Sequence, residues 1–219
     1  MFDFLASRLR RAARLFLALA PAALILVAPA PAQFGAPQTT TVHDPSALKP
    51  PRGAHVAIVE FEDLECPDCA RANPLLKEAA EKYSIPWVRH DFPLPQHNWS
   101  YQAAVNARFF DTKSVKLGND YRDYIFSSQA SIETPGQLQD ITQKFAAAHG
   151  VALPFAIDPM GRLAELVNTD RALGQRIGIE HTPTIWIVTN AVHAAPFVEV
   201  VDRSKLYQLI DQALAEARR

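Results

Sequence analysis

The sequence predicts an α/β protein, in which a small mixed sheet is flanked by helices and interrupted by an all-helical subdomain. Three observations predict this fold class. A strand–helix–strand pattern occupies residues 55–92, and a strand–strand–helix pattern occupies residues 184–218. Between them, residues 97–176 have helical character throughout and are too long for one crossover connection. We therefore expect the insertion to separate two halves of one sheet.

The first half of the sheet begins with an apolar, β-branched run. Residues 55–61 (HVAIVEF) have the composition of a buried strand. Residues 67–83 are rich in Ala, Leu, Lys and Glu, with apolar side chains on one helical face, and predict a helix. Residues 85–92 (IPWVRHDF) predict a second strand, which ends at the breaker Pro93-Leu94-Pro95. The helix makes this unit a βαβ crossover, so the two strands are expected to be parallel.

The insertion carries two signals for the start of a helix. Thr134-Pro135-Gly136-Gln137 supplies an N-cap, a proline at the first helical position and a capping-box glutamine. Helical spacing of apolar residues follows until Gly150, which ends the helix. Asp158-Pro159 predicts the start of another helix in the same way. Three apolar residues of that helix are expected to face inward: Leu163, Leu166 and Val167.

The second half of the sheet follows the tripeptide His181-Thr182-Pro183. Residues 184–189 (TIWIVT) predict a buried strand, and residues 197–201 predict a further strand. The short connection between them indicates a hairpin. A closing helix from about residue 206 has a continuous apolar stripe. The complete order is strand, helix, strand, helical insertion, strand, strand, helix.

Length and composition bound the class of protein. With 219 residues, of which 48% are hydrophobic, the chain suits one globular domain that can bury a sizeable core without covalent cross-links. Its formal net charge is −1, so no basic surface points to a nucleic acid partner. We found no internal repeat.

Residues 1–32 differ in composition from the rest of the chain. Four arginines precede an apolar run that ends in small residues, which is the pattern of a secretory signal peptide. The motif Ala30-Pro31-Ala32 predicts cleavage after Ala32. The alternative is an uncleaved membrane anchor. The apolar run from Leu15 to Ala32 is about the minimum length for spanning a bilayer, but prolines interrupt it.

The remaining chain divides into a linker and a domain. Residues 33–53 are rich in Pro, Thr, Gln and Ala and have little periodicity, so they predict a flexible linker. The domain is expected to occupy residues 54–218, including the helical insertion. If the signal is cleaved, the linker becomes a flexible N-terminal tail; if it is kept, the linker holds the domain off the membrane.

The only two cysteines of the chain, Cys66 and Cys69, stand three positions apart in the stretch FEDLECPDCARAN. As a structural bridge, their disulfide would close a four-residue loop and gain only about 2 kcal/mol. A closed zinc site needs four ligands, and the chain has neither a second C-x-x-C pair nor an H-x-x-x-H motif. We favour the third interpretation, a redox pair that opens and closes, and expect no metal.

The predicted local structure suits a redox pair. Residues three apart on a helix lie on one face, within the Cα separation that a disulfide requires. Cys66 falls where a strand turns into a helix, and the unpaired backbone N–H groups there stabilise a thiolate. Pro67 fixes the first turn of that helix. Cys69 lies one turn further in and is expected to be more buried, so Cys66 would attack and Cys69 would resolve.

Three segments carry a resemblance to a known family: F-x-D-x-x-C-P-x-C at residues 61–69, HDFPLPQHNWSYQAA at 90–104 and GIEHTPTIWIV at 178–188. Together they resemble the DsbA-like branch of the thioredoxin superfamily, and the resemblance spans about residues 54–218. It implies a thioredoxin fold with an all-helical subdomain inserted between its two halves. It also implies an exported thiol:disulfide oxidoreductase.

The resemblance implies a site made of four parts. Cys66 matches the nucleophilic cysteine of the family, and Cys69 matches the resolving cysteine. Thr182 and Pro183 match a loop in which a cis proline lies beside the dithiol and pairs with an extended substrate. Glu60 matches a buried acid that moves the proton of the resolving thiol. The alternatives are an ordinary trans proline at position 183 and a solvated acid at position 60.

The chain departs from the family between the cysteines. The oxidising members best known for C-P-x-C have histidine before the second cysteine, where this chain has Asp68. Aspartate repels a thiolate, so Pro67 and Asp68 are expected to tune the redox potential. Three nearby acids add negative potential: Glu62, Asp63 and Glu65. Our hypothesis is a higher Cys66 pKa than in the strongest oxidases and a reduction potential between about −120 and −270 mV.

The functional prediction is an exported enzyme that forms or exchanges disulfides in secreted or periplasmic proteins. Its substrates would be exported proteins with cysteines, and it would need no cofactor beyond its own disulfide. The family implies reoxidation by a quinone-linked membrane partner. We see no dimerisation domain and expect a monomer. The alternatives are a reductase or isomerase kept reduced by a membrane donor, and a peptide-binding or chaperone module without turnover.

Overall fold

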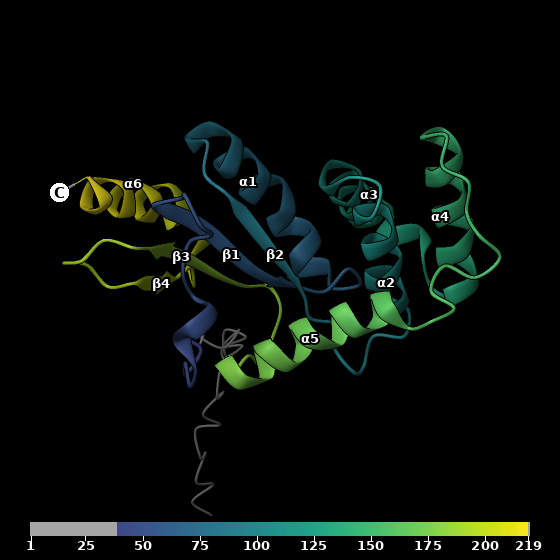
Figure 1. The fold of residues 1–219 in the computed structure, drawn as a ribbon, viewed down its shortest axis with the longest axis horizontal. Helices are drawn as coiled ribbons and strands as arrows, with labels where there is room; N and C mark the ends of the chain where they lie inside the picture. The colour runs from purple at the N-terminus through teal and green to yellow at the C-terminus, as the bar shows by residue number, and fades with distance from the viewer. Residues whose placement is uncertain (1–38, 219) are drawn as a thin grey trace, which may run out of the picture. The chain divides into compact units, whose positions relative to one another are not determined.

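The computed structural model describes residues 39–218, which contain a four-stranded sheet of order β2-β1-β3-β4 (Figure 1). Strand β1 (Val56–Glu62) pairs in parallel with β2 (Trp87–Asp91) and antiparallel with β3 (Thr184–Thr189). Strand β4 (Phe197–Glu199) pairs antiparallel with β3. The two halves of the chain thus join along β1 and β3, and the prediction of a mixed sheet split by a helical insertion is confirmed.

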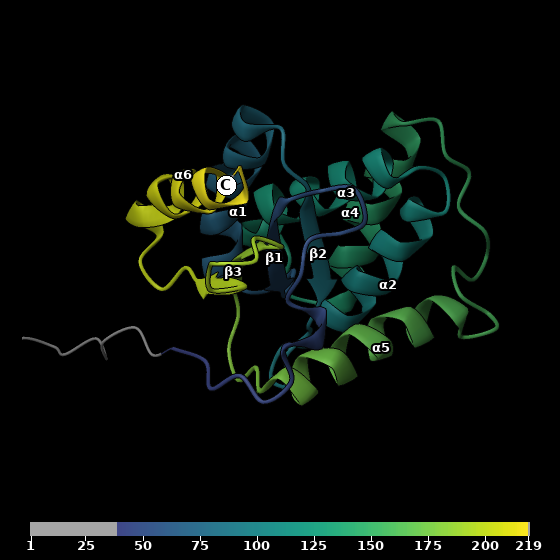
Figure 2. The same ribbon diagram turned by 60° about the vertical axis from the view of Figure 1, so that its left-hand side comes forward.

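Helices cover both faces of this sheet (Figures 1 and 2). Helices α1 (Pro67–Tyr83) and α6 (Leu206–Ala217) pack against the face to which Val56 and Ile58 of β1 point. The intervening residues of β1, such as Val59, point to the opposite face, where the C-terminal end of α5 (Arg162–Ile177) packs. Every residue of β1 is buried, because both faces of this central strand are covered.

The insertion has a core of its own. Helices α2 (Ser100–Asp111), α3 (Val115–Ser128) and α4 (Pro135–Ala148) pack around Tyr121 and other aromatic side chains. The capping box predicted at the start of α4 is present. Helix α5 contacts both α2 and β2, so the last part of the predicted insertion also covers the sheet.

Some predicted boundaries differ from the structure. The helix expected from Asp158-Pro159 begins only at Arg162, after Gly161 in a left-handed conformation. Leu166, which was expected to face inward, is 50% exposed, so that prediction is wrong. Its neighbour Val167 is fully buried, and one residue corresponds to about 100° around a helix. Strand β4 ends at residue 199 rather than 201.

The end of the predicted linker packs on the domain. Thr40 donates to the Glu199 carboxylate through its backbone N–H at 2.6 Å, and the His43 N–H donates to the Ile177 carbonyl at 2.8 Å. The Leu48 side chain is 2% exposed, in the core below the sheet. Residues 39–53 therefore differ from the free linker that their composition predicts, because a few contacts with distant segments hold them. A short 3₁₀ helix, Pro45–Ala47, lies within this stretch.

The predicted signal peptide, residues 1–32, lies outside the described residues. Within residues 39–218, none of the helices is long and apolar enough to span a membrane.

Gly174 lies where α5 packs so closely on the sheet that a side chain would have no room. A Cβ at this position would lie 2.6 Å from ring carbons of Phe92 and 3.1 Å from the ring of Phe61. Alanine normally favours a helix over glycine by about 1 kcal/mol, but overpacking a core costs about 1–3 kcal/mol. We expect Gly174→Ala to lower the free energy of unfolding, measured by urea denaturation. The control Gly136→Ala, whose Cβ would meet nothing closer than 3.8 Å, should not lower it; equal effects would contradict this packing.

Candidate redox site

The two cysteines lie at the junction of β1 and α1. Cys66 is the N-cap residue of α1, Pro67 is the first helical residue, and the Cys66 N–H donates to the Asp63 carbonyl at 3.0 Å. The first backbone N–H groups of a helix have no intrahelical acceptor and are available to a side chain at its N-terminus. Cys66 is 7% exposed, whereas Cys69, one turn further along, is fully buried. Both are free thiols in this structure.

The surroundings push the pKa values of the two thiols in opposite directions. Hydrogen bonds from the Cys69 thiol and from the N–H groups of Cys69 and Asp68, together with the nearby Thr182 side chain, favour the Cys66 thiolate. They outweigh the opposing effect of burial and lower the pKa of Cys66 to about 6. Burial, together with the hydrogen bond and charge of Cys66, raises the pKa of Cys69 well above its usual 9.0. The first sulfur ionises near neutral pH and the second retains its proton.

The loop before β3 lies against the first sulfur. The peptide bond between Thr182 and Pro183 is cis, and the Thr182 carbonyl oxygen lies 3.3 Å from Cys66 Sγ, close enough to accept a hydrogen bond from the thiol. Among the described residues, the buried Thr182 hydroxyl has no hydrogen-bond partner. Loop and dithiol are 116 positions apart in the chain and meet because β3 pairs with β1.

Glu60 is buried in β1, below the cysteines. Its side chain is 1% exposed, and Oε2 accepts a hydrogen bond of 2.9 Å from the Trp87 indole. Within residues 39–218, Oε1 has no hydrogen-bond partner. Burial raises the pKa of Glu60 to about 8, and the charges of Glu62 and Cys66 act in the same direction, whereas Arg89 and the indole oppose it. Glu60 therefore carries a proton at neutral pH and can release it near pH 8, above the range where Cys66 titrates.

The acids that were expected to repel the Cys66 thiolate are held by donors. Asp63 Oδ2 accepts hydrogen bonds of 2.7 Å from the Leu94 N–H and from His97 Nδ1. Glu65 Oε2 accepts from the backbone N–H groups of Trp99 and Ser100, at 2.8 and 2.9 Å, and so caps α2.

Asp68 is held in the same way, by two arginines. Its Oδ1 lies 2.6 Å from Arg203 Nη2 and 3.1 Å from Arg71 Nη2. Burial opposes ionisation of this carboxyl, but the hydrogen bond and charge of Arg203, with Arg71, outweigh it and lower the pKa of Asp68. The sequence shows these negative charges but not the donors and cations that hold them. The repulsion that the thiolate meets is therefore smaller than the sequence alone suggests.

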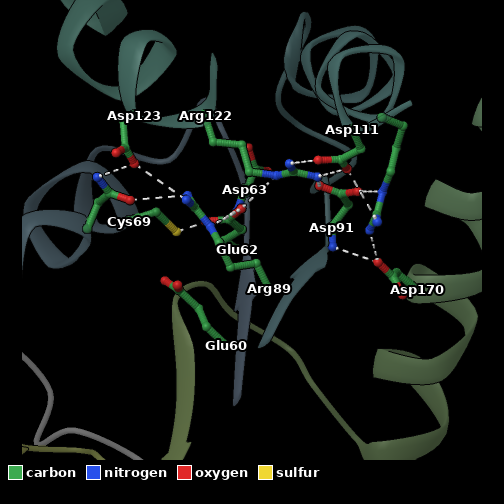
Figure 3. A network of polar contacts seen from close by, with 12 residues as sticks. Glu60, Glu62, Asp63, Cys69, Arg89, Asp91, Asp111, Arg122, Asp123 and Asp170 are labelled. Carbon is green, nitrogen blue, oxygen red and sulfur yellow. Dashed lines mark hydrogen bonds and ion pairs between the residues drawn. The ribbon is translucent and has the colours of Figure 1, made fainter. Parts of the chain in front are cut away.

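Glu62 belongs to a buried ionic network that joins β1 to the insertion (Figure 3). Arg89 of β2 binds its carboxylate through Nη2 at 2.7 Å, and Arg122 of α3 approaches it at 3.5 Å. Arg122 also donates to Asp111 of α2 at 2.9 Å and lies 3.7 Å from Asp91 of β2. Three further residues extend the network: Asp123, Arg108 and Asp170. Since a buried charge without a partner is costly, the network fixes the insertion relative to the cysteines.

The structure brings together all the residues that the sequence suggested for the site, and adds others. Gln129, in the 3₁₀ helix Gln129–Ser131 after α3, donates through Nε2 to the carbonyls of Leu64 and Cys66, at 2.8 and 3.0 Å. Arg203 reaches the motif from the far end of the chain. Neither residue lies in a recognisable motif, so no signal in the sequence could have found them. Within the described residues, no group of three or more His, Cys, Asp or Glu side chains could hold a metal ion.

Comparison with known proteins places this arrangement in a family. The thioredoxin family profile matches residues 52–204, more than half of the chain. The chain belongs to the thioredoxin family. No curated protein matches it in sequence. Solved structures with the same fold include α-DsbA1 from Wolbachia pipientis, at 18% identity and a TM-score of 0.61, with 78% of this chain and 91% of that chain covered.

Two other neighbours have the same fold. The thiol-disulfide exchange protein α-DsbA2 from Wolbachia pipientis is 19% identical, with a TM-score of 0.58, covering 75% of this chain and 84% of that one. A periplasmic thioredoxin-like protein from Salmonella enterica serovar Typhimurium is 20% identical, also with a TM-score of 0.58, covering 76% of this chain and 88% of that one. The DsbA-like fold with a helical insertion is thus confirmed.

The pKa of Cys66 predicts how its alkylation depends on pH. In the reduced protein, the rate constant for iodoacetamide should reach half its plateau near pH 6, because only the thiolate reacts. Cys69→Ala should raise this midpoint, since the Cys69 hydrogen bond is the largest contribution that favours the thiolate. The urea-denatured protein provides the control for an ordinary thiol. A midpoint near 9.0 in the folded protein would contradict the geometry described here.

The raised pKa of Glu60 predicts a dependence of stability on pH. The unfolded chain releases this proton near pH 4.5, whereas the folded protein retains it until about pH 8. The folded state binds more protons in this window, so ionisation of Glu60 makes the free energy of unfolding fall as pH rises. Glu60→Gln removes the titrating carboxyl and with it this loss of stability at higher pH. We expect its stability relative to the wild type, measured by urea denaturation, to increase between pH 5 and 8; a constant difference would contradict the assignment.

Proposed function

We propose that this protein is a thiol–disulfide oxidoreductase that exchanges disulfides with other proteins through Cys66 and Cys69. One observation carries the proposal: two thiols three residues apart have opposite pKa shifts, the more exposed one towards the thiolate and the buried one towards the thiol. A structural bridge does not require this difference. Membership of the thioredoxin family supports the same activity.

In the oxidising direction, the reaction begins with the Cys66–Cys69 disulfide. A substrate thiolate attacks Cys66 Sγ, a substrate–Cys66 disulfide forms, and the bond to Cys69 breaks, leaving the Cys69 thiolate, which takes up a proton. A second substrate thiolate then attacks the substrate sulfur of the mixed disulfide and releases Cys66 as a thiolate. The substrate loses two electrons as it forms its disulfide, and the two cysteines gain them. No cofactor is needed.

Glu60 has the properties of the acid that serves the resolving thiol. Cys69 must gain a proton when it leaves and lose one when it attacks, but it is fully buried. Glu60 is equally buried and protonated at neutral pH, and when it is ionised its charge raises the pKa of Cys69. We assign it to proton transfer with Cys69, directly or through one water.

Thr182 and Pro183 are proposed to bind the substrate chain. The Thr182 carbonyl lies 3.3 Å from Cys66 Sγ, so a peptide joined to that sulfur must pass beside this loop. Proline has no N–H of its own, which leaves the backbone of Thr182 as the edge with which an extended peptide can pair. Pro67 and Asp68 complete the site as the turn between the cysteines.

We further propose that the protein works outside the cytoplasm. The signal-like residues 1–32, cleaved or retained as an anchor, support export, and the similar Salmonella protein is periplasmic. Its substrates are then exported proteins with cysteines. The mature unit comprises the packed domain preceded by the remaining linker residues, acts as a monomer, and is reoxidised by a quinone-linked partner in the membrane.

Trapping with Cys69→Ala tests the proposal. Without the resolving thiol, a mixed disulfide at Cys66 cannot be released within the protein, so substrates should remain attached. The variant should be expressed with its leader and exported proteins analysed by non-reducing electrophoresis followed by reduction. Reaction above pH 7 is preferable, because the variant loses the hydrogen bond that most favours the Cys66 thiolate. We expect several reducible adducts.

The matched control is Cys66→Ala, which retains the buried thiol but lacks the attacking one. It should give no adducts and no disulfide exchange with a reduced model protein. Absence of adducts from Cys69→Ala would contradict the enzymatic proposal. A Cys66→Ala variant with full activity would instead indicate a peptide-binding module without turnover.

A further inference from the structure

Arg203 contacts the turn between the two cysteines from the opposite end of the chain. Its Nη2 donates to Asp68 Oδ1 at 2.6 Å, and its Nη1 donates to the Asp68 backbone carbonyl at 3.2 Å. The two residues are 135 positions apart. One guanidinium thus binds both the side chain and the main chain of the residue that precedes Cys69.

The element that carries Arg203 is well held. Arg203 begins the 3₁₀ helix η3 (Arg203–Lys205), and Asp202 caps it by accepting from the Ser204 N–H at 3.0 Å and the Ser204 hydroxyl at 2.7 Å. Helix α6, which packs on the sheet, follows directly. The side chain is 33% exposed, so part of the contact is shielded from solvent. The geometry is that of a fixed arginine fork rather than of a mobile surface side chain.

The carboxylate contact changes the charge beside Cys66. Asp68 lies in the first turn of α1, two residues from the sulfur that must ionise. Left alone, its negative charge would oppose a second negative charge on Cys66. Arg71 also reaches Asp68 Oδ1, but its side chain is 66% exposed and the pair is a simple i, i+3 contact. Ion pairs with such exposure contribute little, so Arg203 is the main compensating charge.

The contact of Arg203 with the Asp68 carbonyl affects one of the hydrogen-bond donors to Cys66 Sγ. The carbonyl of Asp68 and the N–H of Cys69 belong to one peptide unit, and this N–H is among the donors that favour the Cys66 thiolate. Arg203 binds the oxygen of that unit. A cation at the oxygen polarises the peptide and restricts its rotation, which strengthens the donor at its other end.

We propose that Arg203 is a positioning residue of the redox pair: it cancels the charge of Asp68 and fixes the Asp68–Cys69 peptide so that its N–H points at Cys66 Sγ. Asp68 is then tolerated between the cysteines because a cation from the C-terminal half accompanies it. The inference rests on the proposed function, in which Cys66 must be ionised in the reduced protein. It assigns to Arg203 a role that no motif in the sequence indicates.

The test uses the full-length protein with R203Q, and with R71Q as the matched control on the same carboxylate. The readouts are the pH midpoint of the thiolate ultraviolet absorbance and the thiol–disulfide equilibrium with glutathione. We expect R203Q to raise the Cys66 midpoint and to slow alkylation below that midpoint about three- to tenfold, corresponding to about half to one pKa unit. The equilibrium should shift towards the protein disulfide, because the reduced form loses stabilisation. R71Q should change both readouts less.

A double-mutant cycle with D68N isolates the charge. The effect of R203Q should shrink when residue 68 is Asn, because no carboxylate is left uncompensated. R203K keeps the charge but cannot bind both oxygens of Asp68 as the guanidinium does, so its Cys66 midpoint should lie between those of the wild type and R203Q. If R203Q does not fold, R203K is used in its place. Unchanged readouts in R203Q, equal shifts in R71Q, or an R203Q effect independent of residue 68 would each overturn the proposal.

Failure of this inference and failure of the proposed function give different results. If Arg203 has no such role, the adducts of Cys69→Ala still form and only the R203Q shift is missing. If the protein does not exchange disulfides with other proteins, the adducts are missing, whereas the Cys66 midpoint and the glutathione equilibrium still respond to R203Q.

Discussion

The stabilisation of one negative charge, on Cys66 Sγ, is the interaction on which the site depends. Most of its donors are local: the Cys69 thiol and the N–H groups at the start of α1. They reach the sulfur because Cys66 follows shortly after β1 at the N-terminus of α1, where Pro67 begins the helix. The cis-proline loop, the buried Glu60 and the helical insertion all lie around this sulfur.

The same stretch of chain presents a problem of charge. It carries four acids within a few residues of the thiolate, and all four are engaged by other groups: Glu62, Asp63, Glu65 and Asp68. Their partners come from several other elements, so that neutralising the acids also connects the elements. Arg89 and Arg122 bind β1 to β2 and α3, and Glu65 caps α2. Compensation of charge and attachment of the insertion are therefore achieved by the same contacts.

Features that depend on local sequence could be predicted, whereas features that depend on such long-range contacts could not. The strands, the helix that starts at Pro67 and the capping box at Thr134 follow from local patterns, and the structure has them nearly at the predicted residues. The motif spacing likewise suggested Cys66 and Cys69 without any tertiary information. The packing of Leu48 and the fork at Arg203 leave no periodic signal, because each depends on a single side chain that meets a distant segment.

The hypothesis about Asp68 illustrates the same limit. From the sequence, an aspartate between two cysteines can only be counted as a charge, and a charge beside a thiolate repels it. In the fold it is half of an ion pair whose cation comes from 135 positions away. The size of its influence on Cys66 therefore depends on topology: β3 pairs with β1 and β4 with β3, and the chain that follows carries Arg203 of η3 to α1.

The couplings among Cys66, Cys69 and Glu60 give the proposed cycle an order. The charge on Cys66 raises the pKa of both other groups, so while Cys66 is a thiolate the protons on Cys69 and Glu60 are held more tightly. When Cys66 forms a mixed disulfide, that charge disappears and both pKa values must fall. Cys69 thus becomes easier to ionise in the intermediate that it has to resolve, and Glu60 releases its own proton more readily. Burial alone would hold Cys69 equally inert in every state; it is the loss of one neighbouring charge that makes its reactivity depend on the state of Cys66.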